Sequence, residues 1–237
     1  MLNISDIRKL FVQEYQKENF VIDKTGVKTI EIVGQSFLVD EDSIFGQPNY
    51  QYIQKELQWY ESQSLNVHDI PETPKIWLDV ADSSGFINSN YGWCIFSAEN
   101  GNQYQNCLAE LKRNTFSRRA TMIYTRPSMW ADYNRNNMSD FMCTYAQQFF
   151  IRNNKLISYY LMRSQDTVFG FNNDVSWGKH VMKKLAKDLN IESENLYWTS
   201  ASLHLYERHF YLIEHFIKTG EKHISKKEYK KLYHISI

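Results

Sequence analysis

The sequence is short of cysteine, has no excess of charge of either sign and contains no long apolar run. Its three cysteines, at positions 94, 107 and 143, are an odd number without metal-ligand spacing, which indicates reduced thiols rather than a disulfide framework. Lys and Arg together number 27, as do Asp and Glu, so there is no general basic field to attract nucleic acid or an anionic membrane. No segment approaches a membrane span in length and the start lacks a signal-peptide pattern, so we expect a cytoplasmic protein without nucleic-acid or membrane partners.

Glycine-rich phosphate loops and clusters of Cys or His are missing too, which argues against a P-loop enzyme or a metal centre. The chain is rich in apolar residues. Its 237 residues are 43% apolar and 15% aromatic, which is enough for a substantial core and argues against disorder. Because there is no low-complexity tract, long linker or fixed repeat, we expect one domain over residues 1–237.

The clearest local structure is the stretch CTYAQQFFIRNNKLISYYLMRSQD at residues 143–166. Two β-rich runs flank Asn153 and Asn154, a pair suited to a two-residue hairpin turn. With that turn, Arg152 pairs with Lys155, and every other pair of the two strands is fixed by the same register.

An unbroken register places Cys143 opposite Ser164 and Thr144 opposite Arg163. An arginine close to a thiol favours the thiolate and lowers its pKa from an ordinary value of roughly 8.5. The alternative is that Cys143 is a small hydrophobe, inert in a core. These residues alone leave the two interpretations open.

A carboxylate stands on the apolar face of an expected helix, NYQYIQKELQWYESQ at residues 49–63. Glu56 shares one stripe with the aromatic and aliphatic residues at 52, 53, 57 and 60. A carboxylate on a core-facing stripe is costly unless it is paired, hydrogen-bonded or protonated. Either Glu56 lies at the edge of the stripe and reaches solvent, or it has a functional role.

Three further polar features allow a structural and a functional interpretation. Arg118 and Arg119 precede an expected strand and are either solvated or arranged to bind phosphate through two hydrogen bonds each. His204 and Tyr206 alternate on one strand face and are either structural or placed to hold a sugar hydroxyl. Asp174 has a simple structural interpretation as an acid in a helix's first turn, where the dipole favours it.

Taken in chain order, these features resemble the thymidylate synthase superfamily. The shared motifs are an Arg-Arg pair, a nucleophilic cysteine, RS-x-D, an FG segment opening a helix, and H-x-Y, which occur here at 118–119, 143, 163–166, 169–174 and 204–206. The segments DKTGVKT, KELQWY and NYGW also fit. The resemblance implies an α+β fold with a mixed β-sheet packed against helices, one catalytic domain over residues 1–237, and a homodimer associated sheet to sheet.

Three departures from the synthases favour one branch of this superfamily. Thr144 follows the cysteine where synthases carry histidine, Asp174 replaces the asparagine that reads uracil, and the C-terminus lacks the usual closing tail. All three agree with the bacteriophage branch that hydroxymethylates dCMP, which would act in the host bacterial cytoplasm. The implied reaction transfers a one-carbon unit from 5,10-methylenetetrahydrofolate to carbon-5 of dCMP and adds water, giving 5-hydroxymethyl-dCMP and tetrahydrofolate.

Other functions on the same fold remain open from the sequence. They are hydroxymethylation of dUMP, a divergent thymidylate synthase, and a catalytically silent nucleotide-binding protein. The intact set of Cys143, Glu56 and Arg163 argues against the silent protein.

The resemblance also assigns roles to single residues. Cys143 would be the nucleophile, Glu56 would order a water and pass protons, and Asp174 would read the base. Substrate-binding residues would be Lys24, Arg118, Arg119, Arg163, Ser164, Asn173, His204 and Tyr206, with the arginine doublet supplied by the partner subunit. Asp166 and Trp77 would contact the folate cosubstrate, and no metal would take part.

Overall fold

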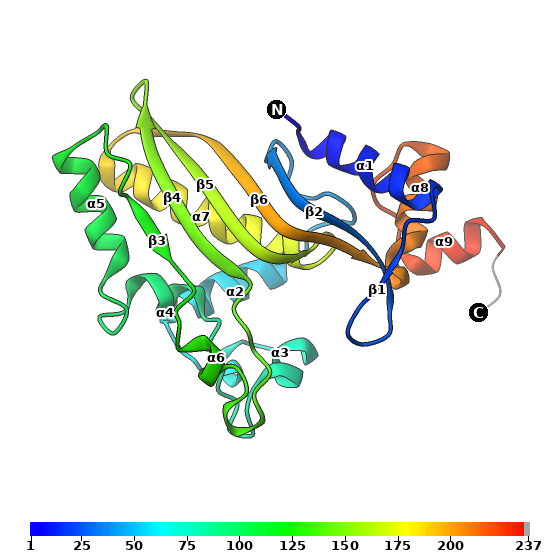
Figure 1. The fold of residues 1–237 in the computed structure, drawn as a ribbon, viewed down its shortest axis with the longest axis horizontal. Coiled ribbons are helices and arrows are strands. Elements are labelled where there is room, and N and C mark those ends of the chain that lie inside the picture. Colours follow the sequence, from blue (N-terminus) through cyan, green and yellow to red (C-terminus); the bar gives the residue numbers. More distant parts are fainter. Residues whose placement is uncertain (235–237) are drawn as a thin grey trace. The chain divides into compact units, whose positions relative to one another are not determined.

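A computed structural model describes residues 1–234 (Figure 1). The prediction that the C-terminus lacks the closing tail of the synthases concerns residues up to 237, and residues 235–237 lie outside the described part. Within residues 1–234, every helix is too short or too polar to cross a bilayer.

Contacts between residues divide the chain into two compact units. The first comprises residues 1–49, 163–176 and those from 197 on, and the second comprises residues 50–162 and 177–196. Three elements run from one unit into the other: β5 (Lys155–Asp166), α7 (Gly170–Leu189) and β6 (Glu192–Tyr206). The expectation of a single catalytic domain stays a prediction.

The first unit is built on antiparallel strands. They are β1 (Val21–Ile22), β2 (Lys28–Leu38) and the C-terminal part of β6. The β2–β6 ladder runs from Thr29 opposite Tyr206 to Leu38 opposite Tyr197. The helices of this unit are α1 (Ile4–Gln16), α8 (Phe210–Thr219), α9 (Lys226–Leu232) and the short 3-10 helix η3 (Glu207–His209).

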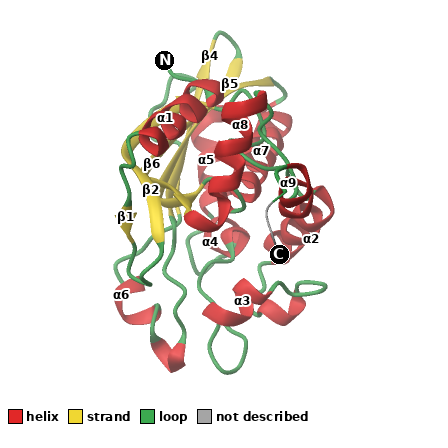
Figure 2. Ribbon diagram, turned by 90° about the vertical axis from the view of Figure 1, so that its right-hand side faces the viewer, coloured by secondary structure: helices red, strands yellow, loops and turns green. Residues whose placement is uncertain are grey.

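Helix α1 forms where it does because both its start and its apolar face are specified. Asn3 accepts a hydrogen bond from the Asp6 backbone and the Asp6 side chain accepts one from the Asn3 backbone, a reciprocal cap that satisfies two otherwise unpaired donors. Ile4, Ile7 and Phe11 are completely buried on one face of the helix. This face packs on β2 and α8, beside which α1 lies in Figure 2.

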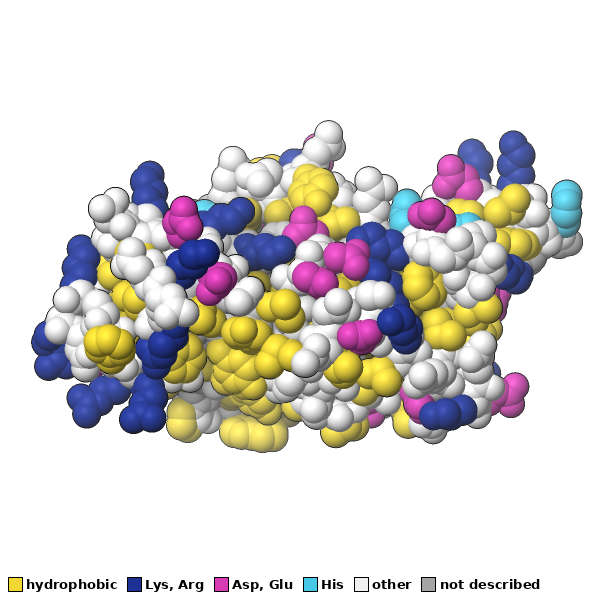
Figure 3. Space-filling model, turned by 90° about the horizontal axis from the view of Figure 1, so that it is seen from above, with side chains coloured by type: hydrophobic (Ala, Val, Ile, Leu, Met, Phe, Trp, Pro, Cys, Tyr) yellow, Lys and Arg dark blue, Asp and Glu magenta, His cyan; other side chains and the backbone are white. Residues whose placement is uncertain are grey.

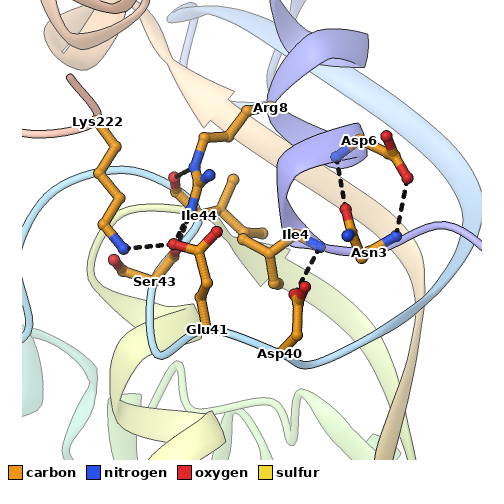
Figure 4. Close-up of polar contacts among 9 residues, drawn as sticks. All are labelled: Asn3, Ile4, Asp6, Arg8, Asp40, Glu41, Ser43, Ile44 and Lys222. Atoms are coloured by element: carbon orange, nitrogen blue, oxygen red, sulfur yellow. Dashed lines mark hydrogen bonds and ion pairs between the residues drawn. The ribbon is translucent and has the colours of Figure 1, made fainter. Parts of the chain in front are cut away.

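A buried arginine ties α1 to the segment that follows β2 (Figure 4). Arg8 donates to the carbonyl oxygens of Ser43 and Ile44 and forms an ion pair with Glu41, which also accepts from Lys222. Burial would raise the pKa of Glu41, but the two cations hold it below its ordinary value. The pairing matters because an arginine buried without acceptors would be strongly destabilising.

The second unit contains the antiparallel ladder of β3 (Thr121–Ile123), β4 (Thr144–Arg152) and β5. Its longer helices are α2 (Tyr50–Ser62) and α5 (Gln103–Arg113). The shorter ones are α3 (Lys75–Val80), α4 (Tyr91–Phe96), α6 (Met129–Asp132), η1 (Val67–Asp69) and η2 (Arg135–Asn137). The core of the unit is aromatic: Trp177 contacts Tyr60 and Tyr91 and donates its indole N–H to the Tyr124 hydroxyl.

The predicted hairpin turn is confirmed, whereas the predicted register around Cys143 is wrong. Asn153 and Asn154 both have positive φ, at 50° and 58°, and Arg152 pairs with Lys155. A bulge between Thr144 and Ala146 then shifts the ladder by one residue, so that Thr144 lies opposite Met162 rather than Arg163. Cys143 stands immediately before Thr144, the first residue of β4.

The six strands follow the order β1-β2-β6-β5-β4-β3. Helix α7 connects β5 to β6, the kind of crossover that parallel neighbours require, while the other ladders are antiparallel. This is the mixed sheet packed with helices that the resemblance implies, and the α+β class is confirmed. Acidic and basic side chains both occur across the face drawn in Figure 3, in keeping with their equal numbers.

Candidate active site

Of the three cysteines, Cys143 is the one whose surroundings suit a reactive thiol. Burial raises the pKa of Cys94 and of Cys107 to about 12 each, which keeps both thiols protonated and unreactive. Cys143 is only half-buried and stands in the loop just before β4. Its Sγ lies 3.8 Å from the Phe141 carbonyl oxygen.

The loop that presents Cys143 is held by a buried carboxylate. Asp140 is 7% exposed and accepts from the backbone N–H groups of Asn88 and Ser89 at 2.7 and 2.8 Å. It also accepts from the Ser89 hydroxyl at 2.7 Å. Burial raises the pKa of Asp140, against the opposing effect of these hydrogen bonds. Asp140 was not among the predicted site residues, although its apolar neighbours in the sequence MSDFMC are the signal that could have marked it.

Glu56 is buried rather than at the solvent edge of its stripe, so the solvent interpretation is wrong. Its side chain is on α2 and is 4% exposed. Tyr52, one turn earlier, donates its hydroxyl to Glu56 Oε1 at 2.6 Å. The indole N–H of Trp77 lies 2.9 Å from the Tyr52 hydroxyl and 3.4 Å from Glu56 Oε1. The structure thus brings together a predicted catalytic acid and a predicted folate residue, with Tyr52 as a third member that the sequence reading missed.

The NYGW segment fixes α4 against α2. Asn90 is completely buried and donates its side-chain amide to the carbonyls of Trp59 and Ser64 at 2.9 and 2.8 Å. A Cβ at Gly92 would lie 1.7 Å from the Tyr60 carbonyl oxygen, so no residue but glycine fits this approach. The motif therefore holds the end of the helix that presents Glu56.

In the other unit, the RSQD segment forms the end of β5 and turns into α7. Arg163 and Ser164 are half-buried. The Asp166 carboxylate accepts from the backbone N–H groups of Val168 and Phe169, at 3.1 and 3.2 Å. These bonds shape the turn, so Asp166 has a structural role in addition to the predicted contact with folate.

Asp174 does not lie in the first turn of a helix, so its simple structural interpretation is wrong. Helix α7 begins at Gly170, and its first turn contains no acidic residue. Asp174 is half-buried, and its Oδ2 accepts a hydrogen bond from the Gln165 side-chain amide at 2.8 Å. Asn173, the neighbouring predicted substrate residue, is also half-buried within the helix.

His204 and Tyr206 share one face at the end of β6. Their rings meet edge to face with centroids 5.0 Å apart, and His204 is 9% exposed. Burial lowers the pKa of His204, although the nearby Asp166 carboxylate opposes the effect. The Thr167 N–H donates to the His204 carbonyl at 3.0 Å, which joins the RSQD and H-x-Y segments within one unit.

The remaining predicted phosphate ligands are exposed. Lys24 lies in the β1–β2 turn, where Asp23 accepts from the N–H groups of Thr25 and Val27. Arg118 and Arg119 precede β3, and both are exposed. Their role in phosphate binding stays a prediction, and so does their donation to a partner subunit. Among residues 1–234, no group of three or more His, Cys, Asp and Glu side chains is arranged to hold a metal ion.

The order of these elements and site residues along the chain is that of one enzyme family. The family model described as Thymidylate synthase matches residues 8–235, and the chain belongs to this family. Within it, the chain is 55% identical to the deoxycytidylate 5-hydroxymethyltransferase of Enterobacteria phage T4, over 96% of both chains. It is 54% identical to the enzyme of that name from phage T2, again over 96% of both. A thymidylate synthase of Francisella tularensis subsp. holarctica is 26% identical, over 83% of this chain and 78% of its own.

Proposed function

We propose that the protein transfers a one-carbon unit from 5,10-methylenetetrahydrofolate to carbon-5 of dCMP and adds water, giving 5-hydroxymethyl-dCMP and tetrahydrofolate. The observation that supports this most is the near-full-length similarity to deoxycytidylate 5-hydroxymethyltransferases, at about twice the identity to a synthase. Asp174, in place of the asparagine of the synthases, supports the same substrate.

Covalent catalysis by Cys143 begins the reaction. Carbon-5 of cytosine is a poor nucleophile, and addition of the Cys143 thiolate to carbon-6 converts carbons 4 to 5 into an enamine. Carbon-5 then forms a bond to the one-carbon unit and loses its proton. After tetrahydrofolate has left, water adds to the exocyclic methylene, and re-formation of the ring double bond expels the thiolate. No reductant is consumed, in contrast to thymidylate formation.

Glu56 is our choice for ordering the water and passing protons. Tyr52 donates to its Oε1 at 2.6 Å and the Trp77 indole N–H lies 3.4 Å from the same oxygen, so these contacts orient the carboxyl group. A general acid or base must be positioned in this way before its pKa matters. Thr144, which replaces the histidine of the synthases, is fully buried and 3.2 Å from the Met162 sulfur, so it is a packing residue here.

The folate cosubstrate supplies the one-carbon unit at the oxidation state of formaldehyde. Trp77 would line the folate site, because an indole can stack on a flat aromatic ring and its N–H is already hydrogen-bonded to the Tyr52 hydroxyl. Asp166 would contact the pterin.

Asp174 would read the base. Cytosine presents an amino donor at carbon-4 and an acceptor at N3, so one carboxyl oxygen must accept and the other must share a proton with N3. Asn173, His204 and Tyr206 would bind the nucleoside, and Lys24, Arg163 and Ser164 its phosphate. The arginine doublet would come from the partner of a homodimer. Large apolar side chains exposed on strands support such a dimer: Val33 on β2, Ile123 on β3 and Tyr145 on β4.

Product analysis tests this function. The purified protein is incubated with methylenetetrahydrofolate and either dCMP or dUMP, and the nucleotides are separated by chromatography while dihydrofolate is followed by absorbance. We expect 5-hydroxymethyl-dCMP without dihydrofolate. Hydroxymethylation of dUMP alone, dihydrofolate formed with dUMP, or the absence of any product would each contradict the proposal.

A further inference from the structure

A buried amide contacts the carboxyl group that would read the base. Gln165 is at the end of β5, 1% exposed, and its Nε2 donates to Asp174 Oδ2 at 2.8 Å. An amide N–H donates only to an oxygen that carries a free lone pair, so this contact requires Asp174 Oδ2 to be an acceptor. Gln165 is thus a donor to one particular oxygen of Asp174.

The chain leaves space for this contact. A Cβ at Gly170 would lie 3.1 Å from Gln165 Nε2 and 3.8 Å from Asp174 Oδ2. The first distance is closer than ordinary van der Waals contact, so a side chain here would push on the amide. Glycine at the start of α7 therefore keeps the pair undisturbed.

Stability alone does not explain why the buried residue 165 is a glutamine. Gln165 Oε1 is buried without a hydrogen-bond partner among the described residues, and burying an unpaired acceptor costs free energy. A methionine would fill a similar volume without this cost. The feature that only the amide supplies is its N–H group, directed at Asp174.

The position of a single proton decides which base a protonated carboxyl group can bind. For cytosine, the oxygen facing carbon-4 must accept from the amino group and the oxygen facing N3 must hold the proton. For uracil the two oxygens exchange roles, because the ring has a carbonyl at carbon-4 and an N–H at N3. A carboxyl group free to move its proton between its oxygens could therefore bind both bases.

We propose that Gln165 is a positioning residue that keeps Asp174 Oδ2 free of the proton and thereby selects a 4-aminopyrimidine nucleotide over a 4-oxopyrimidine one. The inference rests on the proposed function, since it takes Asp174 as the group that reads the base. Oδ2, already an acceptor for the Gln165 amide, would face the amino group, and Oδ1 would share the proton with N3.

Nucleotide binding to the full-length protein tests the proposal without depending on turnover. The dissociation constants of dCMP and dUMP are measured by calorimetry for the wild type and for Gln165→Met. We expect the preference for dCMP to fall about tenfold or more in the variant, mainly through tighter binding of dUMP. The matched control is Asn172→Leu. Asn172 is also a buried amide with an unpartnered oxygen, but its N–H donates to the Val168 carbonyl, so its loss should leave the preference unchanged.

A second variant distinguishes the donor from mere packing. In Gln165→Glu, a protonated carboxyl group can donate to Asp174 as the amide does, whereas an ionised one cannot. The preference of this variant for dCMP should therefore rise as pH falls, relative to the wild type and to Gln165→Met at the same pH. Asp166 and His204, the other titratable groups next to this strand end, are present in all three proteins and cancel in the comparison.

Three results would overturn the proposal. Gln165→Met could keep the wild-type preference for dCMP over dUMP, or Asn172→Leu could lose that preference to the same extent. The third is a preference in Gln165→Glu that equals that of the wild type at every pH. Failure of the proposed function is read from the wild type alone: no preference for dCMP there would contradict both statements at once.

Discussion

Tyr52 donates its hydroxyl to Glu56 Oε1 at 2.6 Å, one turn along α2. The bond fixes a buried carboxyl group that would otherwise choose among several orientations. An activity that depends on a water ordered by Glu56 must therefore depend on Tyr52 as well.

Tyr52→Phe should lower kcat by about 10- to 100-fold, because the carboxyl group loses the bond that orients it while the aromatic packing stays. The measurement is the steady-state rate of product formation, with carbon-5 hydrogen exchange as a second readout. Tyr15→Phe is the matched control, since Tyr15 donates to Glu214 at the same distance of 2.6 Å in the other unit. Equal losses in both variants would contradict a specific role for Tyr52.

Arg119→Ala should weaken dCMP binding, because an arginine can hold a phosphate with two hydrogen bonds. If the doublet crosses to the partner subunit, mixing Arg119→Ala with Cys143→Ser subunits should restore one working site per mixed dimer. Random mixing in equal amounts would give roughly a quarter of the wild-type rate. Mixed dimers that form and stay inactive would show that each subunit uses its own arginines.

Two substitutions of Asp140 should have different effects on stability. Asp140→Ala leaves two buried N–H groups and the Ser89 hydroxyl without their acceptor, at a cost on the order of 2–4 kcal/mol. Asp140→Asn keeps an oxygen for the two N–H groups and removes a charge that burial disfavours. Burial raises the folded-state pKa of Asp140, so the wild type loses stability from this group as pH rises through that pKa.

Denaturant unfolding near pH 7.5 checks the Asp140 pair. We expect Asp140→Asn to match or exceed the wild type and Asp140→Ala to fall below both. An Asn variant as unstable as the Ala variant would mean that the negative charge itself stabilises the loop.

His209 should lower the free energy of unfolding at acidic pH. Burial lowers its pKa from 6.5 to about 4, so the unfolded chain binds the proton more readily in that window. The contribution is complete above about pH 6.5 and is lost as pH falls toward 4. The stability lost through His209 is on the order of 2 kcal/mol near pH 4.5. The difference in unfolding free energy between pH 7 and 4.5 should shrink in His209→Gln, but not in His223→Gln, whose side chain is exposed.

The sequence predicts local structure best where one residue type allows few conformations. Asn153 and Asn154 tolerate positive φ, and the hairpin turn was predictable from them. The bulge after Thr144 was not, because a strand sequence does not show where an extra residue leaves the ladder. The residues expected opposite Cys143 and Thr144 were wrong because the prediction assumed a ladder without this bulge.

The candidate site shows the same limit. Glu56 was identified from its place on an apolar stripe, yet whether it is buried depends on Tyr52 and Trp77, and Trp77 is 21 residues away. Asp140 and Gln165 were not predicted, because acidic and amide side chains are usually exposed and Gln165 stands between polar neighbours in RSQD. Only the fold shows that each is buried and which group it contacts.

Exchange of labelled hydrogen at carbon-5 tests the central claim most directly, because it reports the attack of Cys143 and the choice of base together. The measurement compares dCMP with dUMP for the wild type and for Asp174→Asn, whose amide can donate to a carbonyl at carbon-4 and accept from N3–H. We expect the wild type to release label from dCMP far faster than from dUMP, and the variant to shift this ratio toward dUMP by tenfold or more, on the order of 1–3 kcal/mol per lost pairing. A wild type that prefers dUMP, or a folded Asp174→Asn protein with an unchanged ratio, would contradict it.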